Sequence, residues 1–492
     1  MAKSIKRNFL YNILLNISKV IFPLITAPYI SRVLEPDGVG LFNFANTYAN
    51  WFALFAALGI PYYGIREIAK IKNNVEMETK FVSEIISLSV FSTLLCTFVL
   101  LLSILLIPQL YENYIIFLVA SLVLYFTPIR IEWFFSGKEE FGYITIRSII
   151  IKTISVVLLF ILVKSKNNLI TYVVLYAVSV VANDIWNYIK LIKSGVKPYF
   201  TLAFRKHIKP LFILFSSNIA IYIYTVLDTI MLGFLCGYSE VGFYNCATQI
   251  SKALTLIVTS LAAVALPRVT QYIKEDNLTE MNKLLSQSSS IVGFLSIPIV
   301  FGAISIAPVL VPLFFGEQFC GTIIPLQIII ITVIVVGYNN LTGIQILLGF
   351  GMDKYFLYSI LAGTISSFSI NLIIIPIYGA VGAAISSVIA EIIVLSVMSY
   401  YIFKYTPVCF FNVRETLVTV LISASFLFLS YLVLQIEHGW GGVFLALGSC
   451  SLIYLLAQHI VGNPVEKEIF RIISKRIKAI IMPNGLHENF DK

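Results

Sequence analysis

Four charged residues lie deep inside long apolar runs of the sequence: Lys19, Lys152, Lys252 and Glu391. Each lies about ten residues from the ends of its run, which is roughly 15 Å along a helix that rises 1.5 Å per residue. A charged side chain this deep in a bilayer costs a few kcal/mol or more unless it faces protein or water, so each is a candidate functional residue. Three cations and one acid leave a positive excess, and lysine ammonium groups suit phosphate. Glu391 is the candidate for carrying a proton or pairing with a lysine.

Uncharged polar residues recur at helical spacing in the same runs, so that they share one face of each predicted helix. Such side chains often only hold neighbouring helices together, and for any single residue this explanation comes first. Their equivalent placement in two sets of helices favours a shared polar cavity. The predicted cavity residues are Asn12, Asn16, Asn43, Asn46, Asn50, Asn218, Asp228, Asn245 and Gln249.

The other ionisable residues do not form a recognisable catalytic site. Four charged residues, Arg130, Glu132, Arg147 and Asp184, lie near the ends of their runs, where pairing or contact with the headgroup layer is expected. The six cysteines and four histidines form no metal-binding pattern, and no nucleotide-binding or hydrolase motif occurs. No connection is long enough for a soluble catalytic domain. We therefore expect transport and not an enzyme, with no catalytic residue, no metal and no cofactor.

The elements that position these residues must lie in a membrane. Hydrophobic residues make up 59% of the 492 residues and charged residues only 12%, far outside the usual range of soluble proteins. Many apolar runs reach the roughly 20 residues that a spanning helix needs. The sequence predicts an all-α integral membrane protein with about fourteen spans: 9–33, 39–63, 81–107, 114–136, 142–163, 168–190, 210–235, 241–266, 288–315, 323–348, 356–377, 381–403, 415–435 and 441–461.

The distribution of basic residues predicts the orientation of these spans. The N-terminus and every second connection contain 26 Lys and Arg residues, whereas the other connections contain three, Arg32, Lys164 and Lys166. Lys and Arg beside a span resist translocation, so both termini are expected in the cytoplasm. The asymmetry also accounts for the net charge of +9 without a nucleic acid partner.

One short sequence pattern occurs twice in the chain. The stretch "VGLFNFANTYAN" begins at Val39, and "VGFYNCATQISK" begins 202 residues later at Val241. The same shift aligns Asn16 with Asn218. Short matches of this kind also arise by chance between apolar helices, but a constant shift across six predicted spans favours two parallel repeats with a substrate path where they meet.

The repeat sets the predicted domains. The N-lobe is 1–190, a basic cytoplasmic linker is 191–209, and the C-lobe is 210–403. Two additional spans lie in 404–462, and the tail 463–492 is cytoplasmic. Its stretch "EKEIFRIISKRIKAII" alternates apolar and basic residues at helical spacing, which predicts a helix on the anionic membrane surface.

Several longer stretches resemble bacterial polysaccharide flippases of the multidrug/oligosaccharidyl-lipid/polysaccharide exporter superfamily. They include "TAPYISRVLEPDGVGLFNFANTYANWF", "WFFSGKEEFGYITIRS", "DTIMLGFLCGYSEVGFYNCATQISKAL" and "NLIIIPIYGAVGAAISSVIAE", and the resemblance covers roughly 6–401. The resemblance implies movement of an undecaprenyl-pyrophosphate-linked oligosaccharide across the bacterial cytoplasmic membrane, for O-antigen, capsule or related glycans, coupled to H⁺ or Na⁺. It also implies contact with membrane lipids and with glycan polymerase or assembly proteins. Lys19, Lys152 and Lys252 then become candidates for binding the pyrophosphate.

One departure and two alternatives stay open. Flippases of this kind often have a basic residue near the position of Gln249, whereas here the nearest is Lys252. A multidrug or cation exporter of the same superfamily is the first alternative, but a site for organic cations should be acidic and aromatic. A membrane polymerase or ligase of lipid-linked glycans is the second, and it would need a large outward loop that the sequence lacks.

Overall fold

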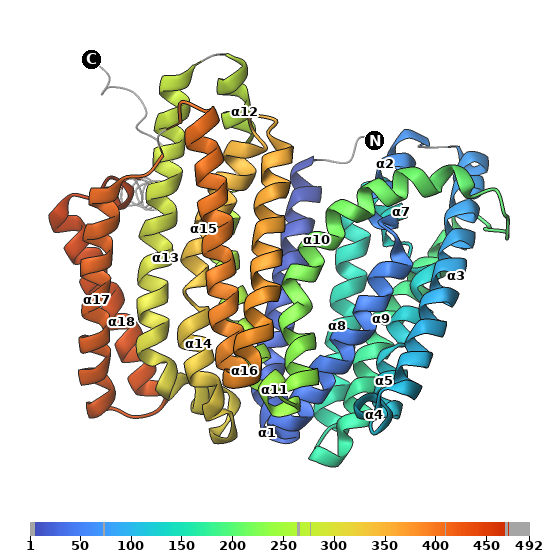
Figure 1. Cartoon of the computed structure of the whole chain (residues 1–492), viewed down its shortest axis with the longest axis horizontal. Coiled ribbons are helices and arrows are strands. Elements are labelled where there is room, and N and C mark those ends of the chain that lie inside the picture. Colours follow the sequence, from blue (N-terminus) through green and yellow to red (C-terminus); the bar gives the residue numbers. More distant parts are fainter. Residues whose placement is uncertain are drawn as a thin grey trace, which may run out of the picture. The chain divides into compact units, whose positions relative to one another are not determined.

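The described part of the chain contains helices and no strand, which confirms the predicted all-α class (Figure 1). The computed structural model describes residues 5–71, 74–262, 266–275, 277–408, 410–467 and 471. Most of the tail predicted to form a surface helix, 466–481, lies outside these residues.

Helices of the first half follow one another with short connections. They are α1 (Ile5–Ala57), α2 (Ile60–Ile71), α3 (Val75–Leu106), α4 (Pro108–Tyr111), α5 (Tyr114–Ala120), α6 (Leu122–Tyr125), the 3₁₀-helix η1 (Thr127–Ile129), α7 (Glu132–Gly137), α8 (Phe141–Leu162), the 3₁₀-helix η2 (Lys166–Asn168) and α9 (Leu169–Lys193).

The second half continues in the same manner. Its elements are α10 (Arg205–Leu235), α11 (Tyr238–Ala262), α12 (Leu266–Lys274), α13 (Leu278–Phe315), the 3₁₀-helix η3 (Glu317–Thr322), α14 (Ile323–Ile329), α15 (Thr332–Asn339), the π-helix η4 (Asn340–Leu347), α16 (Asp353–Tyr405), α17 (Val413–Ile436) and α18 (Trp440–Val461).

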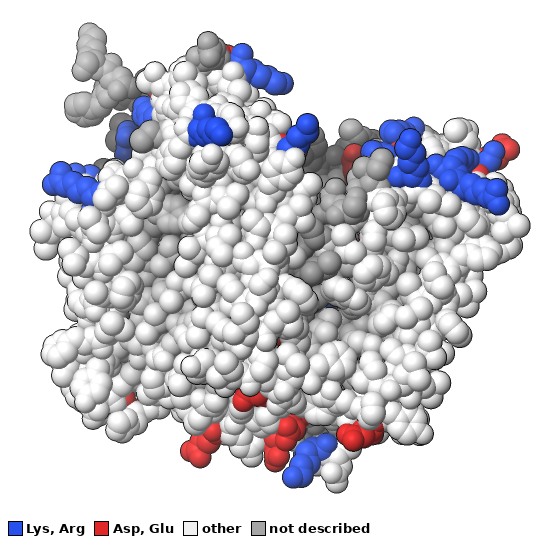
Figure 2. Space-filling view, in the orientation of Figure 1, with Lys and Arg blue, Asp and Glu red and all other residues white. Residues whose placement is uncertain are grey.

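Length and composition make this a multi-pass membrane protein. Within the described residues, nine helical segments are long and apolar enough to cross a membrane, and two shorter apolar segments, Tyr114–Ile129 and Thr225–Leu235, accompany them. On the face shown in Figure 2, Lys and Arg lie near the ends of the helices, and the described surface between the ends is almost uncharged. This face therefore presents hydrocarbon-compatible surface along its helices.

The two longest helices, α1 and α16, are each broken near the middle. In α1 the break is at Glu35, with φ 60° and ψ 173°, directly before Pro36. A residue before proline is disfavoured in the helical region, while proline itself is well suited to start the next helix. In α16 the break is at Gly379, with φ 53° and ψ −129°, a conformation that glycine adopts at little cost. Each break lies in the predicted connection between two spans.

The predicted span 114–136 is not one continuous helix. It consists of α5, α6, η1 and α7, because Pro128 has no N–H to donate within a helix. Two side chains satisfy a carbonyl at the break: the Thr127 hydroxyl and the Arg130 guanidinium both donate to the carbonyl oxygen of Val123, at 3.2 and 3.0 Å. Side chains of this kind make a broken helix tolerable in a membrane protein.

The described residues group into two units. The first falls within Met1–Gln249, Phe314–Ile328 and Ile360–Ala390, and the second within Ile250–Leu313, Ile329–Ser359 and Glu391–Lys492. In the first unit α1 packs against α3, α8 and α10, and the core around Ile68, Trp133 and Phe134 is fully buried or nearly so. In the second unit α17 packs against α18, beside a core that contains Phe294 and Tyr454.

Candidate functional site

Two of the three predicted lysines lie close together in the first unit. Asn12, Asn16 and Lys19 form an exposed polar face on α1, where the Asn16 amide donates to Asn12 Oδ1 at 3.5 Å. Lys152 reaches this helix from α8: its Nζ donates to Ser18 Oγ at 3.1 Å and lies 5.6 Å from the Phe22 ring centroid. Lys19 directly follows Ser18 in α1, so the Lys152 ammonium lies beside the turn that bears Lys19. The structure therefore brings two cations together beside amide groups.

The asparagines of the second half of α1 are half-buried and bond to their own helix. The Asn43 amide donates to the carbonyl of Val39 at 2.8 Å, and the Asn50 amide donates to the carbonyl of Asn46 at 2.8 Å and to its Oδ1 at 2.9 Å. In α11 the Asn245 amide donates to the carbonyl of Val241 at 2.9 Å. Each of these amides keeps further hydrogen-bonding capacity for another helix or a ligand.

Asp228 of α10 is buried in a set of neutral polar groups. Its carboxylate accepts hydrogen bonds from the Tyr244 hydroxyl at 2.5 Å, the Ser387 hydroxyl at 2.7 Å and the Asn371 amide at 2.5 Å. These partners come from α11 and from both halves of α16. The sequence predicted Asp228 as a cavity residue but missed its partners, because separations of 143 and 159 residues leave no local signal. The Asp228 cluster, as we call these four residues, holds a carboxylate among hydroxyl and amide groups.

Glu391 lies in the second unit and is half-buried on α16. The Asn339 amide of α15 donates to its Oε2 at 2.6 Å and to its carbonyl oxygen at 3.2 Å. Asn339 directly precedes the π-helix η4, and π-helical turns are frequent at functional sites. Sequence reasoning placed Glu391 correctly inside an apolar helix but did not predict Asn339 as its partner.

The functional roles of all the predicted site residues stay predictions, including those of Lys252, Gln249 and Asn218. Lys252 is exposed on the part of α11 that belongs to the second unit, and Gln249 is half-buried at the end of the first. Convergence of Lys252 with Lys19 and Lys152 is therefore untested. Asn218 lies in α10, and its side chain lies outside the described part of the structure.

The charged residues near helix ends pair with one another, as expected. Arg130 Nε lies 3.3 Å from Asp184 Oδ2, and Arg147 Nη2 lies 2.6 Å from Glu132 Oε2. Arg147 is almost fully buried and also donates to Asn183 at 3.1 Å and to Asn187. These four residues therefore have structural roles in the first unit.

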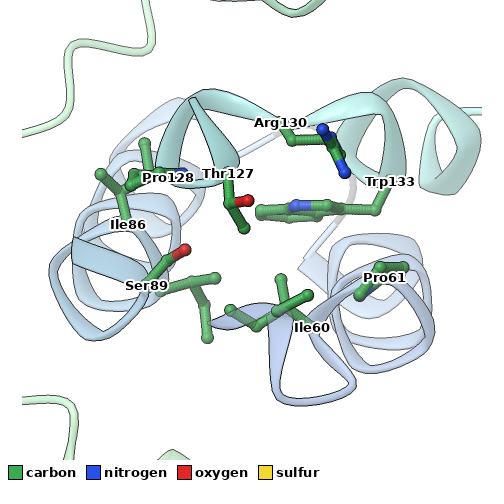
Figure 3. Close-up of a pocket in the computed structure, with 10 residues that line it drawn as sticks. Ile60, Pro61, Ile86, Ser89, Thr127, Pro128, Arg130 and Trp133 are labelled. Carbon is green, nitrogen blue, oxygen red and sulfur yellow. The ribbon is translucent and has the colours of Figure 1, made fainter. Parts of the chain in front are cut away.

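A small pocket beside Arg130 is unsuited to a substrate. Figure 3 shows its lining, in which Ile60, Ser89 and Thr127 face the Trp133 ring and the Arg130 guanidinium lies at the edge. The Ser89 hydroxyl is buried without a partner in the described structure. The volume, about 20 Å³, suits a single water molecule.

The repeated segments meet each other in the first unit. A Cβ on Gly40 would overlap the carbonyl oxygen of Tyr238, and a Cβ on Gly242 would lie 2.5 Å from the carbonyl oxygen of Pro36. Gly242 is equivalent to Gly40, and Tyr238 is equivalent to Pro36, because each pair is separated by 202 residues. The contact of Gly40 with Tyr238 is therefore repeated, with the roles of the two segments exchanged, by the contact of Gly242 with Pro36. We call this reciprocal contact the glycine junction.

Three further features obey the same shift. The Ser239 hydroxyl donates to Asp37 Oδ1 at 2.5 Å. These two residues are equivalent under the shift, so they are in direct contact with each other. Glu35 and Gly237 both have positive φ, 60° and 94°. The hydrogen bond from Asn43 to the carbonyl of Val39 recurs from Asn245 to that of Val241. A contact in which residue i meets j while j meets i is the signature of a two-fold relation.

Long apolar helices, polar faces within them and charges held between them define a multi-pass membrane protein of the transporter class. The chain belongs to the polysaccharide biosynthesis protein family, whose model matches residues 5–273. It is 26% identical over 412 residues to a protein of Escherichia coli (strain K12) described as "Putative O-antigen transporter", covering 81% of this chain and 97% of that one.

Solved structures share the fold. The lipid II flippase MurJ in an inward closed conformation matches with a TM-score of 0.73 and 17% identity, covering 92% of this chain and 98% of that chain. An inward-facing multidrug resistance MATE family transporter of the MOP superfamily matches with a TM-score of 0.59 and 14% identity, covering 78% and 94%. The similar proteins are transporters and flippases rather than enzymes, in agreement with the predicted class.

Proposed function

We propose that the chain is a flippase that moves an undecaprenyl-pyrophosphate-linked oligosaccharide from the inner to the outer leaflet of the bacterial cytoplasmic membrane by alternating access. The observation that carries the proposal is the approach of Lys152 to the exposed face of α1 that bears Lys19, Asn12 and Asn16. Two ammonium groups suit a pyrophosphate, and amides suit sugar hydroxyls. Similarity to an O-antigen transporter and to a lipid II flippase supports a lipid-linked glycan as cargo.

The same proposal includes the layout of the helices. Fourteen spans are consistent with the breaks at Glu35 and Gly379, which divide α1 and α16 into two membrane-length segments each. Two parallel lobes of six spans, 1–190 and 210–403, are supported by the glycine junction. Both termini and the linker 191–209 are then cytoplasmic.

Coupling to a cation gradient has two candidate carboxylates. Asp228 is buried, and its hydrogen bonds within the described structure come from neutral groups. In this proposal the carboxylate binds the coupling ion, H⁺ or Na⁺, and the hydroxyl and amide oxygens serve as further ligands for Na⁺. Glu391 accepts from a neutral amide and is less buried. We place Asp228 ahead of Glu391 as the coupling residue.

The multidrug alternative shares the fold, so only the site distinguishes it. An organic cation would be repelled by Lys19 and Lys152 on the polar face of α1, whereas an anionic head group would be attracted. Charge on this face therefore favours the glycan lipid.

The proposal is tested by disrupting the gene and analysing undecaprenyl-linked intermediates by mass spectrometry. We expect complete repeat units to accumulate on the cytoplasmic leaflet and surface glycan to be lost. The wild-type gene should restore export, whereas Lys19→Gln/Lys152→Gln should not, although its protein reaches the membrane. Normal surface glycan in the disrupted strain, or altered drug resistance alone, would overturn the proposal.

A further inference from the structure

The segment that joins α9 to α10 is held firmly on one side. The N–H groups of Tyr199 and Thr201 donate to Ser83 Oγ and Ser87 Oγ of α3, both at 3.0 Å. These serines lie one helical turn apart, a spacing close to that between two alternate residues of an extended segment. The ring of Phe91 further packs against Phe200 and Phe204, with centroids 5.9 and 5.4 Å apart. We call residues 193–209, fixed in this way along α3, the strap.

The end of the strap is also anchored to α3. Glu84 accepts from Lys206 Nζ at 2.9 Å and lies 2.8 Å from His207 Nε2. His207 is buried, and its Nδ1 lies 2.8 Å from the Tyr63 hydroxyl. The strap is therefore a structured element, and its outer surface has a defined composition.

That outer surface combines exposed apolar and basic side chains. Phe200 and Leu202 are 64% and 65% exposed. Beside them, the exposed cations Lys193, Lys197, Arg205 and Lys209 make no ion pair with any described residue. The sequence has no Asp or Glu from residue 185 to residue 227, so no acid within the segment balances this charge. Figure 2 shows Lys and Arg gathered at this end of the first unit, where Figure 1 places α2 and the start of α10.

Neither water nor hydrocarbon suits such a surface. Large apolar side chains exposed together are costly in water, and four unpaired cations are costly in the bilayer core. The headgroup layer accepts both, because rings and aliphatic side chains enter the acyl boundary while Lys and Arg meet lipid phosphates. Since the strap itself contains basic residues and no acidic ones, anionic headgroups are favoured over zwitterionic ones.

We propose that the strap is a docking surface for anionic phospholipid headgroups, with Lys193, Lys197, Arg205 and Lys209 as the phosphate contacts and Phe200 and Leu202 as apolar anchors. The inference rests on membrane insertion and does not depend on the transported substrate. It assigns the segment a lipid-binding role in addition to its role as a connection between the lobes.

Hydrogen exchange of the full-length protein in nanodiscs tests this proposal. Amides of residues 197–204 are compared in phosphatidylcholine alone and in phosphatidylcholine with about a quarter phosphatidylglycerol. Each cation near an anionic surface contributes roughly a fivefold effect, so we expect at least about tenfold slower exchange with the anionic lipid. High salt should remove most of the difference.

Three variants make the test specific. Lys193→Gln/Lys197→Gln/Lys209→Gln should abolish the lipid effect, whereas Lys80→Gln/Lys274→Gln/Lys354→Gln, which removes three exposed lysines elsewhere, should leave it intact. Phe200→Ser/Leu202→Ser should speed exchange in both lipids. Equal exchange in the two lipids, or equal loss in both triple variants, would overturn the proposal. So would protection produced by soluble polyglutamate and not by phosphatidylglycerol, because it would indicate an acidic protein partner.

Discussion

Lys152 of α8 reaches the turn of α1 that bears Lys19, so two cationic side chains are available there for a bound anion. If they hold a pyrophosphate, their charge matters more than their shape, because attraction in a poorly solvated cavity is much stronger than in water. We expect Lys→Gln at either position to reduce export by about tenfold or more and Lys→Arg to retain part of it. Surface glycan per membrane-inserted protein is the measurement, with Lys164→Gln as the control. Reduced protein level with unchanged export per molecule would instead indicate structural pairing.

Asp228 offers a sharper test of coupling because its partners are known. Asp228→Asn presents one acceptor oxygen to three donors, so we expect the free energy of unfolding to fall by about 1–3 kcal/mol. Export should also lose its dependence on the H⁺ or Na⁺ gradient. Tyr244→Phe keeps the carboxylate and removes one donor, so it should destabilise the protein less and leave the gradient dependence in place. Flippase assays in vesicles with imposed gradients, together with thermal unfolding, separate these effects. If export by Asp228→Asn still depends on the gradient, Asp228 is not the coupling residue and Glu391 becomes the candidate.

At the scale of elements, two turns related by the 202-residue shift carry different residues at positions that both have positive φ. Glu35 has φ 60° and ψ 173°, a region in which a side chain is strained, whereas its equivalent Gly237 has φ 94°. We expect Glu35→Gly to raise the free energy of unfolding by about 1 kcal/mol and Gly237→Ala to lower it. The 3.9 Å contact of Glu35 with Lys166 is exposed and should contribute little. Thermal unfolding in detergent measures both, and stabilisation by Gly237→Ala would contradict the proposed strain.

The glycine junction makes a second prediction at this scale. Gly40→Ala places a methyl group against the Tyr238 carbonyl of the neighbouring helix, so α1 and α11 must separate at this point. We expect a loss of about 1–3 kcal/mol in the free energy of unfolding. Gly302→Ala in α13 is the control, because its Cβ would lie in ordinary contact with Phe426, 4.0 Å from its Cδ2. Equal stability of the two variants would show that the junction is loose.

The sequence predicted elements far better than contacts. Apolar runs and their breakers located most helices, because a membrane demands long uninterrupted segments. Pro128 could be read in the sequence. Its effect on 114–136 could not be predicted, because it depends on hydrogen bonds from the Thr127 and Arg130 side chains to Val123 that only the structure shows. The polar residues inside helices could likewise be identified, whereas the partners of Asp228 lie on helices distant in sequence. The strap was recognised as basic, but its attachment to Ser83 and Ser87 required the structure.

At the scale of the whole molecule, the proposed alternating access requires the contact between the two proposed repeats to open and close. Asp37 and Ser239 are equivalent residues that touch across this contact, so Asp37→Cys/Ser239→Cys in a background without the native cysteines should form a disulfide or accept a short cross-linker. We expect cross-linking to stop glycan export, because the cross-linked junction can no longer open, and we expect reduction to restore export.

Glu35→Cys/Lys166→Cys is the control, since it joins two segments of the same proposed lobe and should leave export nearly unchanged. Export is measured as new surface glycan in cells before cross-linking, after it and after reduction. Continued export with the 37–239 pair fully cross-linked would mean that the junction is a fixed hinge, and the moving contact would have to be sought elsewhere along the helices.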